Sequence, residues 1–334
     1  MDEKSYNKVN NSDNSNINNS NDNKYKFFPK NKNALQKIIK SQIKKFGNKV
    51  DLNNIDVSKI TDMNKLFYDL NFNGDISKWN TGNVKSTLSM FEHSNFNNDI
   101  NNWDVSNVIN MESMFYDSNF NQDISNWNVS NVKNMSSMFA FSNFNQNINN
   151  WDVSNVENMA AMFYGADFNR DISNWDVSNV TSMQYLFNTS KFNKDISNWN
   201  VSNVVNMSWM FYDADFNQNI LNWDVSNVKT MHSMFYNSEF NQDISNWNVS
   251  NVKNMVSMFY NSKFNQDISN WDISNVTSMS KMFYGSEFNK NISKWFSKLN
   301  KNCKLNNFIK NKNIEINSYE DFKQYHRKMI LEKI

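Results

Sequence analysis

Residues 96–119 read FNNDINNWDVSNVINMESMFYDSN, and near copies of this stretch fill most of a chain of 334 residues. Ten of the eleven tryptophans lie 24 positions apart, from Trp79 to Trp295, and the interval never changes. Two columns of phenylalanine keep the same interval, beginning at Phe67 and Phe72. A period of about 20 to 50 residues is typical of solenoids, whose coils bury apolar side chains against their neighbours. The sequence therefore predicts a column of stacked coils.

The first half of each coil carries a strand pattern. In the unit quoted above, Ile100, Trp103 and Val105 have the spacing that lays one short strand along the inner wall of a leucine-rich-repeat horseshoe. We therefore expect one strand in each coil, with rungs about 4.8 Å apart. Ten rungs at that uniform spacing make an elongated body about 48 Å long.

The second half of each coil carries a helical pattern. Val108, Met111, Met114 and Phe115 recur at spacings of three, three and one, and such positions share one stripe of a helix. These spacings fit an α-helix and a 3₁₀ helix equally well. The repeat thus predicts a leucine-rich-repeat-like α/β solenoid with one short strand and one short helix in each 24-residue coil.

The ends of the chain differ from the repeat. Residues 1–32 are rich in Asn, Ser, Asp and Lys, a composition typical of a disordered tail. Residues 33–51 contain an amphipathic pattern that ends at Gly47, which predicts a helix capping the first coil. We expect the solenoid over residues 52–296 and a basic helical cap over residues 297–334.

Composition argues against several classes of function. The 34 Lys and Arg nearly balance 33 Asp and Glu, so binding of nucleic acid is not expected, and no apolar run approaches the roughly 20 residues of a membrane span. The two ends are basic, with seven lysines and no acid in residues 30–49, but such a run is usually a solvated helix face. Cys303 is the one cysteine, and no Cys or His cluster offers metal ligands. We expect no metal and no cofactor.

Catalysis requires groups that converge, and a solenoid separates residues by their coil. His93 and His232 lie 139 residues apart, which is nearly six coils. No Ser or Cys has a His partner at a recognisable spacing, and the five glycines form neither a P-loop nor a dinucleotide fingerprint. The sequence therefore predicts no catalytic residue and a chain that is not an enzyme.

The repeat resembles that of a known family. The string FNQDISNWNVSNVKNMSSMF (residues 120–139) closely resembles the repeat of the BspA-like leucine-rich-repeat surface-protein family, and GNKVDLNNIDVSKITDMNKLF (residues 47–67) is similar to the segment that often precedes it. The resemblance covers about residues 47–296 and implies a right-handed solenoid with a surface or adhesion role. The first twenty residues lack the basic start and apolar stretch of a secretory signal, which instead predicts a cytoplasmic or intracellular location.

One slot on the predicted helix departs from the repeat. It reads Ser113, Ser137, Ala161, Tyr185, Trp209, Ser233, Ser257 and Lys281. Since residues three or four apart are adjacent on a helix, we expect an exposed patch of Tyr185, Val205, Trp209 and Tyr212. Exposed Trp and Tyr are typical of interface hot spots, so the patch predicts a protein partner. The alternative is that Tyr212 belongs to a structural stripe of tyrosines and that Trp209 is a stray.

The polar slots allow a second hypothesis. The slot after each Trp includes Asp104, Asn128, Asp152, Asp176, Asn200 and Asp224. Interleaving amides with carboxylates limits repulsion along the stack, and two Asn columns, beginning at Asn73 and Asn83, can form amide ladders. The structural interpretation is favoured, and the alternative is a uniform polar wall that binds a glycan or another surface polymer.

Overall fold

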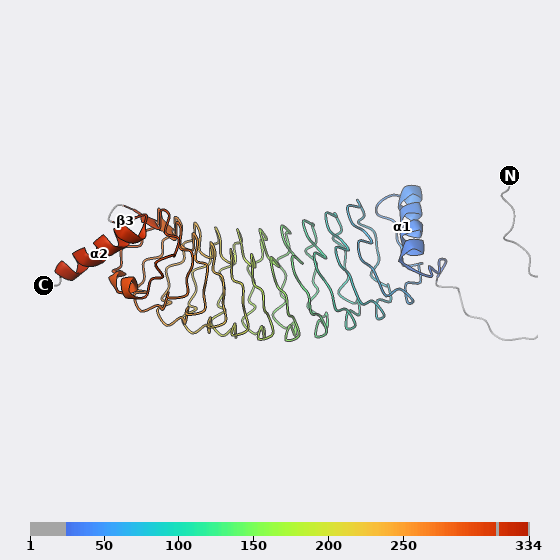
Figure 1. Ribbon diagram of the computed structural model, residues 1–334. Coiled ribbons are helices and arrows are strands. Elements are labelled where there is room, and N and C mark those ends of the chain that lie inside the picture. The colour runs from blue at the N-terminus through green and yellow to red at the C-terminus, as the bar shows by residue number, and fades with distance from the viewer. Residues whose placement is uncertain (1–24, 312–313, 333–334) are drawn as a thin grey trace, which may run out of the picture.

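The protein is a curved column of stacked coils with a helix at each end (Figure 1). The structure, a computed structural model, describes residues 25–311 and 314–332, so most of the predicted tail lies outside the described residues. Helix α1 (Lys32–Phe46) stands across the N-terminal end of the column, and α2 (Tyr319–Leu331) lies at the C-terminal end. The coils between them have little regular secondary structure.

The tryptophans form one buried column, as the period predicts. The rings of Trp127 and Trp151 stack with centroids 6.4 Å apart and planes 5° from parallel. Trp247 is flanked on both sides, by Trp223 at 6.5 Å and by Trp271 at 6.4 Å. Identical side chains 24 positions apart therefore lie on top of one another.

Each tryptophan of the column also forms a hydrogen bond between coils. The indole Nε1 of Trp127 donates to the backbone carbonyl of Ile100, 3.0 Å away and 27 positions earlier. The same bond is made by all ten column tryptophans from Trp79 to Trp295. A side-chain donor thus satisfies a carbonyl that a strand would have paired with a backbone amide.

The predicted strand at the tryptophan wall is wrong. In the part of the chain that is described, the regular strands are β1 (Phe283–Tyr284), β2 (Ile309–Lys310) and β3 (Glu315–Ile316), all near the C-terminus. Ile100, Trp103 and Val105 are buried as expected, but the Trp103 amide closes a turn on the Ile100 carbonyl at 3.0 Å. Neighbouring indole centroids are 6.2 to 6.5 Å apart here, which is wider than the roughly 4.8 Å of a backbone ladder.

The predicted helix in each coil is also wrong. Across residues 25–311 and 314–332 the α-helices are α1 and α2, and both are end caps. In the second half of a coil the amides alternate between two uses. The Phe115 amide donates to the Met138 carbonyl in the next coil at 2.9 Å, whereas the Met114 amide closes a turn on Met111 at 3.2 Å. Parallel bridges such as Asn110↔Asn134 mark this wall as the true ladder of the stack.

A recurring left-handed residue explains why no helix forms. Ser113 has φ 53°, and the equivalent residue of each coil from Lys65 to Lys281 also has positive φ. A left-handed residue interrupts a right-handed helix, so the spacing of three reflects successive tight turns. The two walls of a coil consequently have different spacings, a backbone ladder on one and wider indole stacking on the other. The body in Figure 1 is also curved along its length.

The two asparagine columns form ladders, although each pairs with backbone. The side-chain oxygen of Asn73 accepts from the Asn97 amide at 2.9 Å, and nine such bonds run up the column. In the other column, Asn107 Nδ2 donates to the Gly82 carbonyl at 2.8 Å, again in nine successive coils. Both columns therefore have the structural role favoured for them.

The caps close the ends of the core. In α1, the Asn31 side chain accepts from the Ala34 amide at 3.0 Å, Leu35 and Ile39 are buried, and Gly47 follows with φ 87°. At the other end β1 pairs with β2 in parallel, β2 pairs with β3 antiparallel, and the 3₁₀ helix η1 (Ser293–Ser297) and α2 pack beside them. The bridge Ser278↔Lys304 extends the ladder beyond the expected end at residue 296, and a separate bridge, Phe27↔Ile55, attaches the segment before α1 to the tryptophan wall.

Candidate functional site

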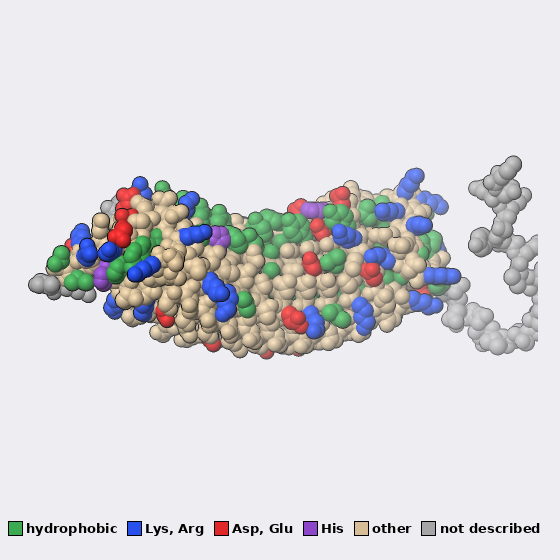
Figure 2. Space-filling model, viewed as in Figure 1, with side chains coloured by type: hydrophobic (Ala, Val, Ile, Leu, Met, Phe, Trp, Pro, Cys, Tyr) green, Lys and Arg blue, Asp and Glu red, His purple; other side chains and the backbone are tan. Residues whose placement is uncertain are grey.

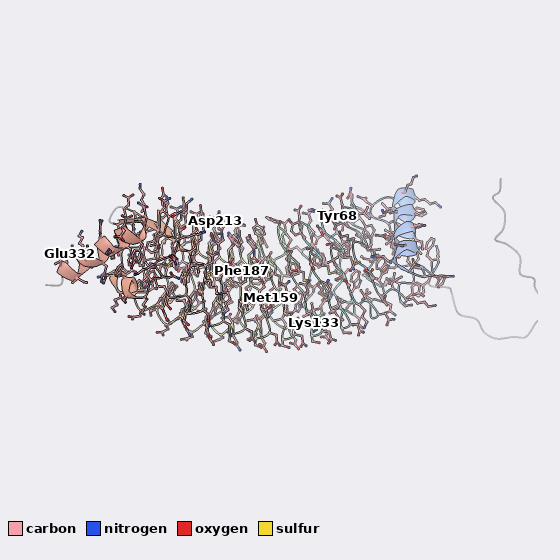
Figure 3. The ribbon with its side chains drawn as sticks, in the orientation of Figure 1. Tyr68, Lys133, Met159, Phe187, Asp213 and Glu332 are labelled. Carbon is pink, nitrogen blue, oxygen red and sulfur yellow. The ribbon has the colours of Figure 1, made fainter. Side chains whose placement is uncertain are left out.

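A row of partly exposed rings runs along the concave margin of the column. Figure 2 shows green and purple side chains along this upper margin, and Figure 3 places Tyr68 and Asp213 there, with Lys133 at the opposite, convex margin. Neighbouring rings are 4.4 to 5.9 Å apart. We call this row the aromatic ribbon, which consists of Tyr68, His93, Tyr116, Phe141, Tyr164, Tyr185, Trp209 and His232.

The centre of the ribbon is a stacked pair with an imidazole against it. The rings of Tyr185 and Trp209 are 4.7 Å apart and 9° from parallel, and His232 meets Trp209 edge-on at 4.4 Å. The Nδ1 of His232 donates to the Val256 carbonyl at 2.9 Å, because a carbonyl can only accept. Burial lowers the pKa of His232, so a neutral imidazole is favoured beside the indole.

The repeat itself does not require this pair. Tyr185 and Trp209 have φ 60° and 57°, and they occupy the slot that is left-handed in each coil. Coils on either side place Ser137, Ala161 and Ser233 in the same slot with the same backbone conformation. Positive φ is less favourable for a bulky side chain than for a small one, so the aromatic pair costs more in this slot than the serines of other coils.

Two of the four predicted patch residues contact each other in the structure. Tyr185 and Trp209 stack, whereas the Tyr212 ring stacks on Tyr236 at 4.6 Å, with Tyr260 and Tyr284 continuing that column. Val205 is 43 % exposed but belongs to the row of Lys133, to which backbone bonds connect it through two intervening coils. Because no helix forms, Val205 and Tyr212, which were expected from helical spacing, do not join the pair. Tyr185, which was expected from stacking between coils, does stack on Trp209.

Sequence reasoning missed several members of the ribbon. Phe141, 41 % exposed with φ 56°, lies in a slot that other coils fill mainly with Asp, Asn or Gly. Its ring contacts Tyr164 at 4.4 Å, and a Cβ added to Gly165 would come within 2.7 Å of it, so this glycine makes room for the ring. Comparing that slot from coil to coil would have revealed Phe141 and His93, because both break its small polar pattern.

The predicted polar ladder serves the turns of the backbone. Asp104 Oδ1 accepts from the Ser106 amide at 3.0 Å and from its hydroxyl at 2.6 Å. The amide bond recurs for each of the other predicted wall residues, Asn128, Asp152, Asp176, Asn200 and Asp224. A side-chain oxygen that accepts from the amide two positions on forms an Asx turn, and Asp and Asn do this equally well. The alternation of Asp and Asn in this slot is therefore explained by a shared local role.

These turns link stability to pH. Hydrogen bonds from the serine hydroxyl and amide two positions on lower the pKa of Asp104, Asp176 and Asp224. A carboxyl whose pKa is lower in the folded than in the unfolded chain stabilises the fold above its ordinary pKa, and that contribution is lost as the pH falls through the folded value. Replacing all three by Asn, which other coils already use, should therefore leave a fold whose stability falls less between about pH 5 and pH 2.

Urea unfolding followed by circular dichroism at several pH values measures this effect. A control variant with Asp69→Asn, Asp215→Asn and Glu239→Gln removes the same charge from positions outside these turns and should keep the acid sensitivity of the native chain. Equal acid sensitivity in the triple-Asn variant and the native protein would contradict the role given to the three turns.

Pockets and metal ligands offer little chemistry in the repeat. A hollow of about 890 Å³ lies at the C-terminal cap, between α2 and the last coil, and includes Asn289, Asp321, Tyr325 and Lys328 in its lining. Among the described residues there is no group of three or more His, Cys, Asp or Glu placed to hold a metal ion. The aromatic ribbon is therefore the surface that departs most clearly from the rule of the repeat.

Fold and surface together define a solenoid repeat protein with an aromatic row on its concave margin. Residues 33–143, 140–239 and 213–320 each match the family described as Mycoplasma protein of unknown function, DUF285. These matches cover well over half of the chain, so the chain belongs to this family. No curated protein matches it. No helix in the described part of the chain is long and apolar enough to cross a membrane.

Proposed function

We propose that the protein is a non-enzymatic scaffold that binds another protein through the centre of the aromatic ribbon. The observation that carries the proposal is the stacked pair Tyr185 and Trp209, which occupies a strained slot that other coils fill with small or flexible side chains. Nothing in the stack requires rings at these positions. Aromatic residues retained at a conformational cost are typical of binding surfaces.

The surroundings of the pair favour a partner recognised by shape and polar contacts. Gln184 directly precedes Tyr185 and accepts from Asn206 Nδ2 at 2.9 Å, and the Thr230 hydroxyl lies 2.9 Å from that of Ser208, directly before Trp209. Gln184, Asn206 and Thr230 are uncharged and partly exposed. A rigid aromatic anchor with uncharged hydrogen-bonding groups around it is the usual centre of a protein interface. The stacked core supplies the rigidity, because side chains and backbone bond each coil to the next.

The proposal also includes the handedness of the coil and the kinship with BspA-like proteins that the repeat suggests. It takes the coil to be right-handed and the chain to share the adhesion or host-interaction role implied by its resemblance to BspA-like proteins. The inward Ile, Trp and Val of the repeat, all buried, support that relationship. Fractionation of source cells into cytosolic and surface-bound material tests where the partner is met.

Exchange of the pair for the residue of neighbouring coils separates binding from folding. We expect the variant with Tyr185→Ser and Trp209→Ser to fold with an unfolding midpoint within about 5 °C of the native chain, because serine already occupies this slot elsewhere. With a partner recovered by affinity capture and purified, its dissociation constant should rise at least about 30-fold, the loss of one interface hot spot. Isothermal titration calorimetry measures the dissociation constant of the partner for the native chain and for the variant.

The control is Ile109→Ser, which removes an exposed apolar side chain, 46 % accessible, from the row of Lys133 at the convex margin. It should leave the affinity unchanged. Unchanged affinity in the Tyr185 and Trp209 variant, with folding confirmed, would exclude this surface. A ligand that is lost only on changing Asn128, Asp152 and Asp176 to Ser, which can keep the turn, would instead support the polar wall and a glycan.

A further inference from the structure

The N-terminal cap carries a concentrated positive charge, most of which forms no ion pair with the solenoid. Residues 25–49 contain eight lysines and no Asp or Glu. Residues 50–293 contain 13 Lys and Arg against 25 Asp and Glu, a net charge of −12. The chain is therefore nearly neutral only because two basic ends, residues 25–49 and 294–334, offset an acidic body. A distribution of this kind directs the cap, and not the body, toward anionic surfaces.

Most of these lysines have no acidic partner. In the described residues, Lys32 is the member of the segment that forms an ion pair, with Asp62 at 2.8 Å. Lys37, Lys40 and Lys44 are exposed on α1 at spacings of three and four, so they share one face. Leu35 and Ile39, on the other side of α1, are buried in the core. The lysine face therefore points away from the first coil.

Two exposed aromatic rings accompany the charge. Phe28 is 63 % exposed and Phe46 is 59 % exposed, whereas the phenylalanines of the two repeat columns are buried. Phe28 precedes α1 and Phe46 is its last residue, with Lys45 Nζ 5.0 Å from the Phe46 ring centre. By helical spacing Phe46 lies on the same side of α1 as Leu35 and Ile39, opposite Lys37, so the positive charge of the lysine face is the feature that fits an anionic lipid surface.

We propose that the lysine face of α1, formed by Lys37, Lys40 and Lys44, binds the surface of an anionic lipid bilayer. Because α1 stands across the end of the column, contact through this face holds the solenoid end-on and keeps its acidic body away from the lipid charge (Figures 1 and 2). The same acidic body disfavours a long nucleic acid, which would extend beyond the cap and run beside like charge.

Co-sedimentation of the full chain with vesicles tests the proposal. We expect binding to vesicles of equal parts phosphatidylcholine and phosphatidylglycerol, little binding to phosphatidylcholine alone, and weaker binding as salt is raised. Changing Lys37, Lys40 and Lys44 to Glu should reduce the partition coefficient at least about tenfold.

The matched control is Lys194→Glu with Lys229→Glu and Lys253→Glu, three exposed lysines of the acidic body. This control should bind vesicles within about twofold of the native chain, since only charges close to the bilayer contribute. Equal losses in both charge-reversed variants, no loss in the cap variant, or equal binding to neutral vesicles would overturn the proposal. Tighter binding to double-stranded DNA than to vesicles, abolished by the cap variant, would assign the face to nucleic acid instead. Circular dichroism confirms that each variant is folded.

Discussion

Trp247→Ala should lower the free energy of unfolding of its coil by about 3 to 5 kcal/mol. The ring lies between Trp223 and Trp271 and packs against Phe235 at 6.5 Å, so its removal leaves a cavity that rigid neighbours cannot fill. It also removes the indole donor from the Ile220 carbonyl, which lies 3.0 Å away. Native-state hydrogen exchange of the amides in coils around Trp247 measures the loss, because each coil depends mainly on its neighbours.

The chain contains its own control for this experiment. Trp209 lies outside the column and is only partly buried, so Trp209→Ala should cost about 1 kcal/mol or less. Similar costs for the two substitutions would mean that the column is not the main source of stability in its coils.

Deleting residues 152–175 should leave a folded protein, whereas deleting residues 152–163 should not. The longer deletion removes one complete period and joins Trp151 to Asp176, which restores the native Trp-Asp sequence. The shorter one removes half a coil and with it Val153, Val156, Met159, Met162 and Phe163, all buried. Both deletions remove these side chains, but the shorter one also joins Trp151 to Tyr164, so the buried side chains that follow no longer stack on their own columns, at about 1.5 to 3 kcal/mol each.

Thermal unfolding followed by circular dichroism, together with limited proteolysis, distinguishes the two deletions. The full-period variant should melt within about 5 °C of the native chain, because the loss of one coil leaves the remaining contacts unchanged. The half-period variant should lack a cooperative transition and be cut near the junction. A native-like transition in the half-period variant would show that the stack tolerates a shifted register.

The sequence predicts the contacts that depend on stacking between coils. It does not predict the features that depend on local backbone geometry. The columns headed by Trp79, Asn73 and Asn83 follow directly from the constant interval, since one contact recurs in each coil. The turns do not, because Met111, Met114 and Phe115 occupy the same spacing in a helix and in successive turns. The deciding feature is the positive φ of Ser113, and serine carries no local signal for that conformation.

The candidate site shows the same division. Tyr185 and Trp209 were recognised as neighbours because they occupy the same slot in adjacent coils, and they stack at 4.7 Å. His232 was missed because it lies one slot away and reaches the indole edge-on. A ribbon that changes slot between coils is visible only when the side chains are placed in space.

Three kinds of hydrogen bond connect each coil to the next along the column. Indoles donate to carbonyls, asparagine side chains bond to the backbone, and backbone amides donate to backbone carbonyls. Tension applied at the two ends of the column loads the successive interfaces between coils in series. The weakest coil therefore detaches first, and the others stay intact. Each detached coil of 24 residues lengthens the chain by up to about 80 Å. With the proposed lipid contact at α1 and the proposed partner at the aromatic ribbon, the coils between them would extend stepwise under load.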